Sequence, residues 1–220
     1  MTTQQPLRQG NTAYRSREYL TVNEVKALLD AAHNRGKHKQ RDYTLMLLMF
    51  RHGLRASEAI NLRWDAIMFE EEDIFINRLK GSESGTHKLQ ADEIEALLLI
   101  KEAYPGFHHV FVHDRIKERL RDKVFMGALK EKKLPPDTAE QMTLDALAKI
   151  FERTGEAANL GIKAHPHMMR HSCGYFLAAQ GMTTRDIQEF LGHKNIQHTV
   201  RYTKHNAERF KQINWSWEKK

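Results

Sequence analysis

The chain has 220 residues, and its 35 lysine and arginine side chains outnumber its 28 aspartate and glutamate side chains, giving a formal net charge of +7. This length suits one domain, and the positive charge favours a polyanionic partner such as nucleic acid. The single cysteine, Cys173, excludes an internal disulfide, and the sequence shows neither a secretion signal nor an apolar run long enough to cross a membrane. We therefore expect a soluble cytoplasmic protein with no membrane partner.

The first part of the chain predicts helices. Residues 1–19 are polar and rich in arginine, which indicates a flexible basic arm. Thr21 and Glu24 have the spacing of a capping box, and the apolar residues that follow them predict a first helix. The strongly apolar segment 41–52 predicts a second helix at the centre of the core, and a short helix is expected over 56–62.

The middle of the chain predicts a small sheet. Three segments alternate between apolar and polar side chains and predict antiparallel strands: 65–69, 73–79 and 87–91. This arrangement places Lys80 at the tip of the second hairpin. Further helices are expected over 92–103, 115–133 and 143–161, with a short strand or extended segment over 108–113. The expected fold is α+β and mostly helical, with a small three-stranded antiparallel sheet.

Residues 166–180 predict a helix with two different faces. Pro166 suits the first helical turn, and Gly181 suits a helix end. At about 100° per residue, Met169 and Cys173 fall on an apolar face, which favours a buried structural thiol. The opposite face carries four residues that suit phosphate binding, with the glycine leaving room for a bulky anion: His167, Arg170, His171 and Gly174.

Several residues outside this helix fit the same chemistry. Metal-free cleavage of a phosphodiester needs a nucleophile, cations for the non-bridging oxygens and an acid for the leaving oxygen. Tyr202 is the candidate nucleophile, and it needs nearby cations and a proton acceptor such as His167. The other candidates are Arg55 and Arg170 as forked phosphate ligands, His193 as a hydrogen-bond donor and Lys80 as the acid.

These residues stand in motifs that resemble a known family. GLRASE, then Lys80, then HPHMMRH, LGH and Tyr202 resemble in order and spacing the signature of the tyrosine recombinases, also called phage-integrase-type recombinases. The resemblance covers roughly residues 19 to 214. The longer segments FRHGLRASE, NRLKGSESGTH, HPHMMRHSCG and LGHKNIQHTVRYT look like the short bacterial recombinases that invert the promoter segment of type 1 fimbriae.

The resemblance implies a role for each matching residue. It makes Tyr202 the nucleophile and the following residues the activating set: Arg55, Lys80, His167, Arg170 and His193. Glu58 and His171 are expected to orient these groups without touching the phosphate. The resemblance also implies a 3′-phosphotyrosine intermediate with a free 5′ hydroxyl, and a reaction that needs no ATP, metal or other cofactor.

The resemblance extends to partners and domains. It implies double-stranded DNA as the substrate, two protomers on each site, four at synapsis and possible accessory DNA-bending proteins, in the nucleoid. We expect a catalytic domain over 20–205 and a tail over 206–220 that docks on a neighbouring protomer. The family's usual N-terminal DNA-binding domain has no counterpart before Thr21, and the segment 115–140 is longer than in the fimbrial type. Inversion, excision and integration of a DNA segment all remain open as outcomes.

Three alternatives use some of the same residues. A metal site would draw on His165, His167 and His171, but Met168 stands where a zinc-binding helix of this spacing needs glutamate. A type IB topoisomerase would use a similar set for DNA relaxation, and the short chain argues against it. A catalytically silent DNA-binding regulator on the same fold is the alternative from a different class, and the intact catalytic set argues against that.

Overall fold

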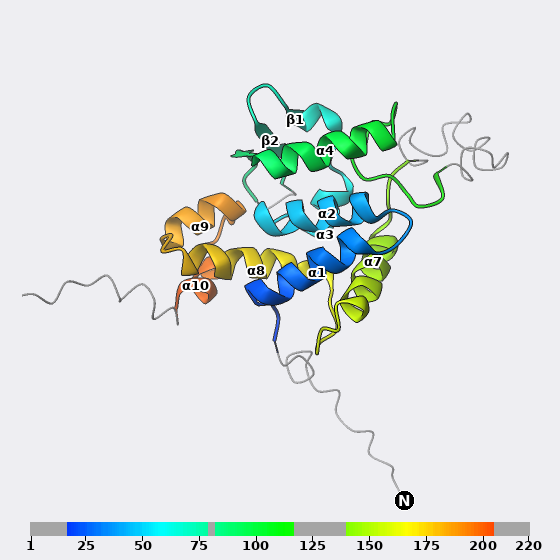
Figure 1. Cartoon of the computed structure of the whole chain (residues 1–220). Helices are drawn as coiled ribbons and strands as arrows, with labels where there is room; N and C mark the ends of the chain where they lie inside the picture. Colours follow the sequence, from blue (N-terminus) through cyan, green and yellow to red (C-terminus); the bar gives the residue numbers. More distant parts are fainter. Residues whose placement is uncertain (1–16, 79–81, 117–139, 205–220) are drawn as a thin grey trace, which may run out of the picture.

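The computed structural model describes residues 17–78, 82–116 and 140–204 (Figure 1). Lys80, most of the predicted helix 115–133, residues 1–16 of the predicted arm and the predicted tail 206–220 lie outside these ranges. The described helices are α1 (Val22–Asn34), α2 (Lys39–Arg51), α3 (Ala56–Ile60), α4 (Ala91–Ala103), α7 (Leu144–Ala157), α8 (Pro166–Ala179), α9 (Thr184–Leu191) and α10 (Gln197–Thr203). The predicted fold class, mostly helical with a small antiparallel sheet, is confirmed.

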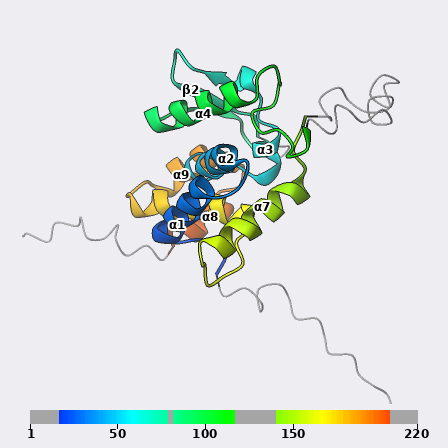
Figure 2. The ribbon, with the colours of Figure 1, turned by 45° about the vertical axis from the view of Figure 1, so that its right-hand side comes forward.

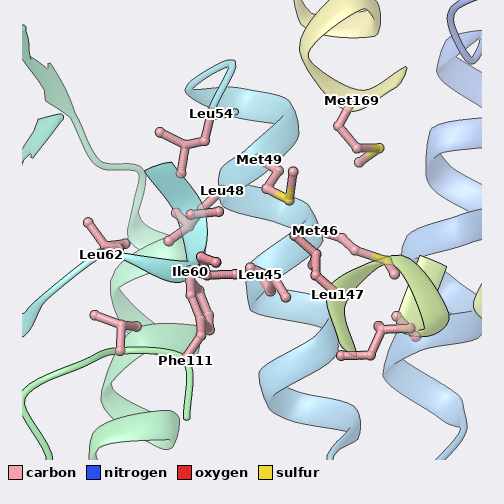
Figure 3. Close-up of a cluster of buried hydrophobic side chains, with 14 of the residues drawn as sticks. Leu45, Met46, Leu48, Met49, Leu54, Ile60, Leu62, Phe111, Leu147 and Met169 are labelled. Atoms are coloured by element: carbon pink, nitrogen blue, oxygen red, sulfur yellow. The ribbon is translucent and has the colours of Figure 1, made fainter. Parts of the chain in front are cut away.

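Helix α2 is the centre of the fold, as its composition predicts. It contacts α1 and α8 on one side and α4 on the other, and Figure 2 shows it between these helices. Its apolar residues Leu45, Met46, Leu48 and Met49 are completely buried. Figure 3 shows these four side chains surrounded by apolar side chains from other elements, among them Phe111. Burial of this kind stabilises a fold by about 25 cal/mol for each Å² of apolar surface removed from water.

Local signals in the sequence place the helix ends. The Thr21 hydroxyl accepts a hydrogen bond from the Glu24 amide, and the Glu24 carboxylate accepts one from the Thr21 amide, which completes the predicted capping box. Thr143 accepts from the Ala146 amide at the start of α7, as expected. Pro166 occupies the first turn of α8, and that helix ends two residues before Gly181.

The sheet is confirmed, but its first two strands are shorter than predicted and its third strand lies earlier than predicted. Strands β1 (Ile67–Met68), β2 (Asp73–Ile76) and β3 (Gly85–Lys88) pair antiparallel in that order. The first strand is shorter than 65–69 because residues Trp64–Ala66 form the 3₁₀ helix η2. The third strand lies earlier than 87–91 because Gln90 caps the N-terminus of α4, where its amide donates to the Glu93 carboxylate. Local capping of the next helix therefore overrides the alternation of side chains.

The segment 108–113 is extended and belongs to none of these strands. His109 makes a single bridge with Arg63, and Val112 makes one with Gln141. Val110, Phe111 and Val112 are fully buried, so the segment lines the core from outside the sheet. Within the part of the chain that the structure describes, no helix is long and apolar enough to cross a membrane.

Candidate active site

One cavity, of about 490 Å³, collects most of the predicted site residues. It is lined by residues that come from the start of α3, from α8, from the turn after α9 and from α10: Arg55, His167, Arg170, His171, His193 and Tyr202. Glu58 is buried behind Arg55, and Lys80 lies outside the described residues. Residues far apart in the sequence thus meet at a single pocket.

Tyr202 is buried in the wall of this cavity, with only 3% of its surface exposed. Its ring packs against α8 at Gly174, where an added Cβ would lie 2.7 Å from the ring. The space at Gly174 therefore accommodates the tyrosine ring, whereas the sequence suggested room for an anion. The Tyr202 hydroxyl lies 3.0 Å from His171 Nδ1, so its hydrogen-bond partner is His171 and not the expected His167.

Burial sets the protonation of this tyrosine and its neighbours. It raises the pKa of Tyr202 to about 12, although Arg170 and Arg201 act in the opposite direction. Burial lowers the pKa of His171 and of His193 to about 3. At neutral pH the tyrosine hydroxyl is therefore protonated, and the imidazole beside it is neutral and able to accept a hydrogen bond from that hydroxyl. Partial burial, Arg170 and Arg55 also lower the pKa of His167.

Arg170 connects the ends of two helices. Its side chain is buried, with Nη1 donating to the Gly53 carbonyl at 2.6 Å and Nη2 donating to the Leu191 carbonyl at 2.8 Å. Each of these nitrogens carries a second N–H, so the guanidinium keeps donors for a ligand in the cavity. Burial, Arg78 and Arg55 lower its pKa to about 9, and it remains charged at neutral pH.

Arg55 makes the local ion pair that its spacing from Glu58 suggests, and it also lines the cavity. Nη1 donates to Glu58 Oε1 at 2.6 Å, and Nη2 donates to the Ser82 hydroxyl at 2.8 Å. The Arg55 side chain is 28% exposed, whereas the Glu58 side chain is 1% exposed. The carboxylate thus holds one side of a guanidinium whose other side faces the pocket.

His193 follows a turn that only glycine fits. Gly192 has a φ of 68°, and a Cβ there would lie 2.3 Å from the Glu83 carbonyl oxygen. The Gly192 carbonyl accepts a hydrogen bond from the Glu83 amide at 3.1 Å, which ties this turn to the start of β3. His193 Nδ1 lies 2.9 Å from the Thr199 hydroxyl, and this contact fixes the orientation of the ring beside the cavity.

The charged residues around the cavity are predominantly positive. Among the residues that the structure describes, four cations line it, namely Arg55, Arg170, Lys194 and Arg201, against the one carboxylate of Glu18. Glu18 already pairs with Arg201 at 3.3 Å. The cavity is therefore suited to an anion. Within the described residues, no group of three or more His, Cys, Asp or Glu side chains is arranged to hold a metal ion.

Sequence reasoning missed Arg78 and Ser82. Arg78 is buried directly behind Glu58 and donates to Glu58 Oε2 at 2.7 Å. A signal was available, because Ile74, Ile76 and Arg78 occupy alternate positions along β2 and its continuation, and all three are buried. An arginine in the inward register of a strand indicates a buried polar network. Ser82 sits in the loop before β3, where no pattern distinguished it.

The chain is similar to a known protein family and to two curated proteins. The family model described as "Phage integrase family" matches residues 18–209. The Type 1 fimbriae regulatory protein FimB of Escherichia coli K12 is 41% identical over 199 residues, which cover 89% of this chain and 88% of that protein. The Type 1 fimbriae regulatory protein FimE of the same strain is 38% identical over 203 residues, 92% of each chain.

Solved structures share the fold. The crystal structure of XerA recombinase superimposes with a TM-score of 0.66 at 21% identity, covering 88% of this chain and 62% of that chain. The XerH site-specific recombinase, described as bound to a palindromic difH substrate in a post-cleavage complex, gives a TM-score of 0.66 at 22% identity over 92% of this chain and 54% of that one. At such identities the likeness concerns the fold alone. The family match and the two fimbrial relatives show that the chain belongs to the phage integrase family and is a tyrosine-type site-specific recombinase.

Proposed function

We propose that the chain breaks and rejoins duplex DNA by forming a covalent bond between Tyr202 and a DNA phosphate. The observation that carries this proposal is a tyrosine hydroxyl in the wall of a cavity whose described lining holds four cations and one carboxylate. A phosphodiester is an anion, and a site preorganised with positive groups stabilises the charge on its oxygens during attack. The excess of positive charge therefore suits phosphoryl transfer to a tyrosine.

In the proposed step the Tyr202 oxygen attacks the phosphorus, and the bond from phosphorus to the 5′ oxygen of the next nucleotide breaks. The tyrosine proton passes to neutral His171, which already lies 3.0 Å from the hydroxyl. Arg55 and Arg170 bind the non-bridging oxygens. The departing 5′ oxygen takes a proton from Lys80, which we assign by resemblance to the family because that residue lies outside the described ranges.

The remaining predicted residues fit supporting roles. His193 donates a hydrogen bond to the phosphate, His167 assists proton transfer at the cavity mouth, and Glu58 orients Arg55 through their 2.6 Å ion pair. The product is a 3′-phosphotyrosine and a free 5′ hydroxyl. Because the tyrosyl bond conserves the energy of the phosphodiester, rejoining reverses the same steps without ATP.

The names of the relatives suggest the biological setting. XerH is described as bound to a palindromic difH substrate, and FimB and FimE are described as type 1 fimbriae regulatory proteins. We extend these descriptions to this chain as a proposal: it acts on duplex DNA in the nucleoid, two protomers bind each site, four assemble at synapsis, and inversion of a promoter segment produces phase variation. Accessory DNA-bending proteins and docking of residues 206–220 on a neighbour complete the proposed assembly. Phosphate contacts should make binding fall steeply with salt.

Detergent trapping of a covalent complex tests this proposal. Wild-type protein is incubated in chelator with supercoiled plasmid that carries the chromosomal region flanking its coding sequence, and adducts are counted after denaturation. We expect adducts with wild type and with Tyr175→Phe, whose ring lies 5.1 Å from that of Tyr202, and none with Tyr202→Phe. DNA binding without any wild-type adduct would instead support a silent regulator on this fold.

A further inference from the structure

Arg78 has more hydrogen bonds to the framework of the active site than its position after a strand would suggest. Nη1 donates to Glu58 Oε2 at 2.7 Å and to the Gly53 carbonyl at 3.2 Å. Nη2 donates to the His52 carbonyl at 3.0 Å and to the Phe190 carbonyl at 3.1 Å. The Arg78 side chain is 1% exposed, so all of these contacts are shielded from water.

The backbone carbonyls that accept hydrogen bonds from Arg78 lie at the ends of two helices. The carbonyls of His52 and Gly53 lie just beyond the C-terminal end of α2, and that of Phe190 belongs to the last turn of α9. Carbonyls at a helix C-terminus lack intrahelical donors and carry partial negative charge, so a buried guanidinium satisfies them well. Arg78 therefore holds the end of α2 against the end of α9.

Arg170 joins the same two ends from the cavity side. It shares the Gly53 carbonyl with Arg78 and takes the Leu191 carbonyl, next to the Phe190 carbonyl that Arg78 takes. The placement of the Arg170 guanidinium thus depends on carbonyls that Arg78 also fixes. A displacement of either helix end would move the donors of Arg170 relative to a phosphate in the cavity.

Arg78 reaches Arg55 through Glu58. One carboxylate oxygen accepts from Arg55 Nη1, and the other accepts from Arg78 and from the Arg55 amide. Burial raises the pKa of Glu58, but Arg78 and Arg55 together lower it below its ordinary value, so the carboxylate is ionised at neutral pH. Without Arg78, the buried Glu58 carboxylate would keep only Arg55 of the two arginines that are described as its ion-pair partners.

We infer that Arg78 is a positioning residue for the strand cleavage proposed above: it orients Arg55 through Glu58 and Arg170 through the Gly53 carbonyl, without touching the phosphate. This inference rests on the proposed function and adds a residue that the family signature did not supply. Lysine cannot replace it, because a single ammonium can pair with Glu58 but cannot fork onto carbonyls of two helices.

Arg41 provides a matched control at the opposite end of α2. It is 1% exposed, donates to Asp42 and to the Val112 carbonyl, and pairs with Asp114. It is therefore a buried arginine with the same kinds of partners as Arg78, and neither arginine lines the cavity. Unlike the partners of Arg78, the described partners of Arg41 make no described hydrogen bond or ion pair with Arg55 or Arg170. Arg41→Lys replaces a buried guanidinium group with a single ammonium group, as Arg78→Lys does, and leaves the active site unchanged.

The test measures adduct formation by the full chain on the plasmid described above, over a range of protein concentrations, together with urea unfolding. For Arg78→Lys we expect the rate at saturating protein to fall by about 10- to 100-fold, the usual effect of losing a group that orients direct ligands, with little change in the half-saturating concentration. For Arg41→Lys we expect a comparable loss of stability and a wild-type rate. A rate for Arg78→Lys within threefold of wild type, or an equal fall in Arg41→Lys, overturns the inference.

A second pair of variants keeps the inference testable if Arg78→Lys fails to fold. Glu58→Gln preserves the shape of the link and removes its charge, so the saturating rate should fall while DNA affinity stays the same. If the double variant Arg78→Lys/Glu58→Gln folds, its fall in saturating rate should be smaller than the product of the two single falls, because both changes remove the same contact between Arg78 and Glu58. A wild-type rate for Glu58→Gln, or a fully multiplicative double variant, contradicts the inference. Absence of any adduct with wild type would overturn the proposed function itself.

Discussion

The two ends of helix α2 bury arginines in opposite ways. At the N-terminal end, Arg41 lies between the carboxylates of Asp42 and Asp114, so that one guanidinium meets two acids. Arg153 approaches Asp42 at 3.4 Å, and its exposed side chain contributes little. The buried guanidinium at this end is thus compensated by carboxylates, and none of these residues lines the cavity.

Just beyond the C-terminal end, three described guanidinium groups lie near the single carboxylate of Glu58, whereas Arg51 in the last helical turn pairs separately with Asp92 and Glu93. Arg55 and Arg78 both pair with Glu58, while Arg170 donates only to backbone carbonyls among the contacts the structure describes. Positive charge is therefore left over, and it faces a cavity. Charge balance therefore separates the two roles. A buried arginine whose charge is compensated by carboxylates supports the fold, and an arginine beside a pocket without such compensation prepares a site for an anion.

Removing the Arg41 guanidinium, at the N-terminal end of α2, should affect the stability of the fold alone. In Arg41→Met the carboxylates of Asp42 and Asp114 lose their shared partner, and removal of one member of such a buried set costs about 3–5 kcal/mol. Urea unfolding should show this loss in the free energy of unfolding. At temperatures where the variant stays folded, its rate of adduct formation should equal that of wild type. A large fall in that rate would show that the two ends are not independent.

Removing Arg55 or Arg170, beyond the C-terminal end of α2, should affect the rate of DNA cleavage first. Arg55→Ala and Arg170→Ala remove donors to the phosphate, and each should lower adduct formation by about 10²- to 10³-fold, or about 2.7–4 kcal/mol of barrier. Arg55→Ala leaves the buried Glu58 carboxylate paired with Arg78, so it should lower the free energy of unfolding less than Arg41→Met does. Single-turnover kinetics at saturating protein give the comparison. A change below tenfold for both variants would remove these arginines from the site.

Overfilling the packing beneath Tyr202 should have an intermediate effect. Gly174→Ala puts a methyl group 2.7 Å from the tyrosine ring, which must then move away from α8. We expect a loss of about 1–3 kcal/mol in the free energy of unfolding, and a slower adduct formation because the hydroxyl leaves His171. Gly161→Ala is the control, since a Cβ there meets nothing within 4 Å. Equal behaviour of the two variants would mean that the ring tolerates displacement.

The smallest effect concerns pH and the histidines near the unbalanced end. Burial lowers the pKa of His87, His171 and His193 to about 3, whereas an unfolded histidine titrates near 6.5. Between these values the unfolded chain binds protons that the folded chain does not, so the free energy of unfolding should fall as pH is lowered from about 7 to about 5. His87→Phe retains a ring against Phe190 and removes one titration. Its stability should therefore depend less steeply on pH, and identical slopes in urea unfolding would contradict this.

Sequence reasoning was reliable where the signal is local. The Thr21 capping box, the Thr143 cap and the proline at the start of α8 place helix ends through bonds between near neighbours, and all three are confirmed. The first strand is shorter and the third lies earlier than predicted, because a 3₁₀ turn and a helix cap compete with alternation over a few residues. Such competition is decided by tertiary contacts that a short segment does not contain.

At the site, the sequence predicted residue types better than their surroundings. The expected polar face of α8 is largely buried, because α9 and α10 pack over Arg170, His171 and Gly174. Periodicity reports which face is polar, but it does not show what covers that face. For the same reason the hydroxyl partner of Tyr202 was assigned to His167, although the geometry selects His171. Both histidines lie on the same helix, and only the position of α10 distinguishes them.

Locating the covalent bond between protein and DNA tests most directly whether Tyr202 is the nucleophile. Wild-type adducts would be digested with nuclease and protease, and the peptide that carries a residual nucleotide would be identified by mass spectrometry. We predict a nucleotide linked through its 3′ phosphate to Tyr202, the tyrosine that lies beside the cationic cavity. Attachment to Tyr175, to any other residue, or through a 5′ phosphate would contradict the proposed mechanism.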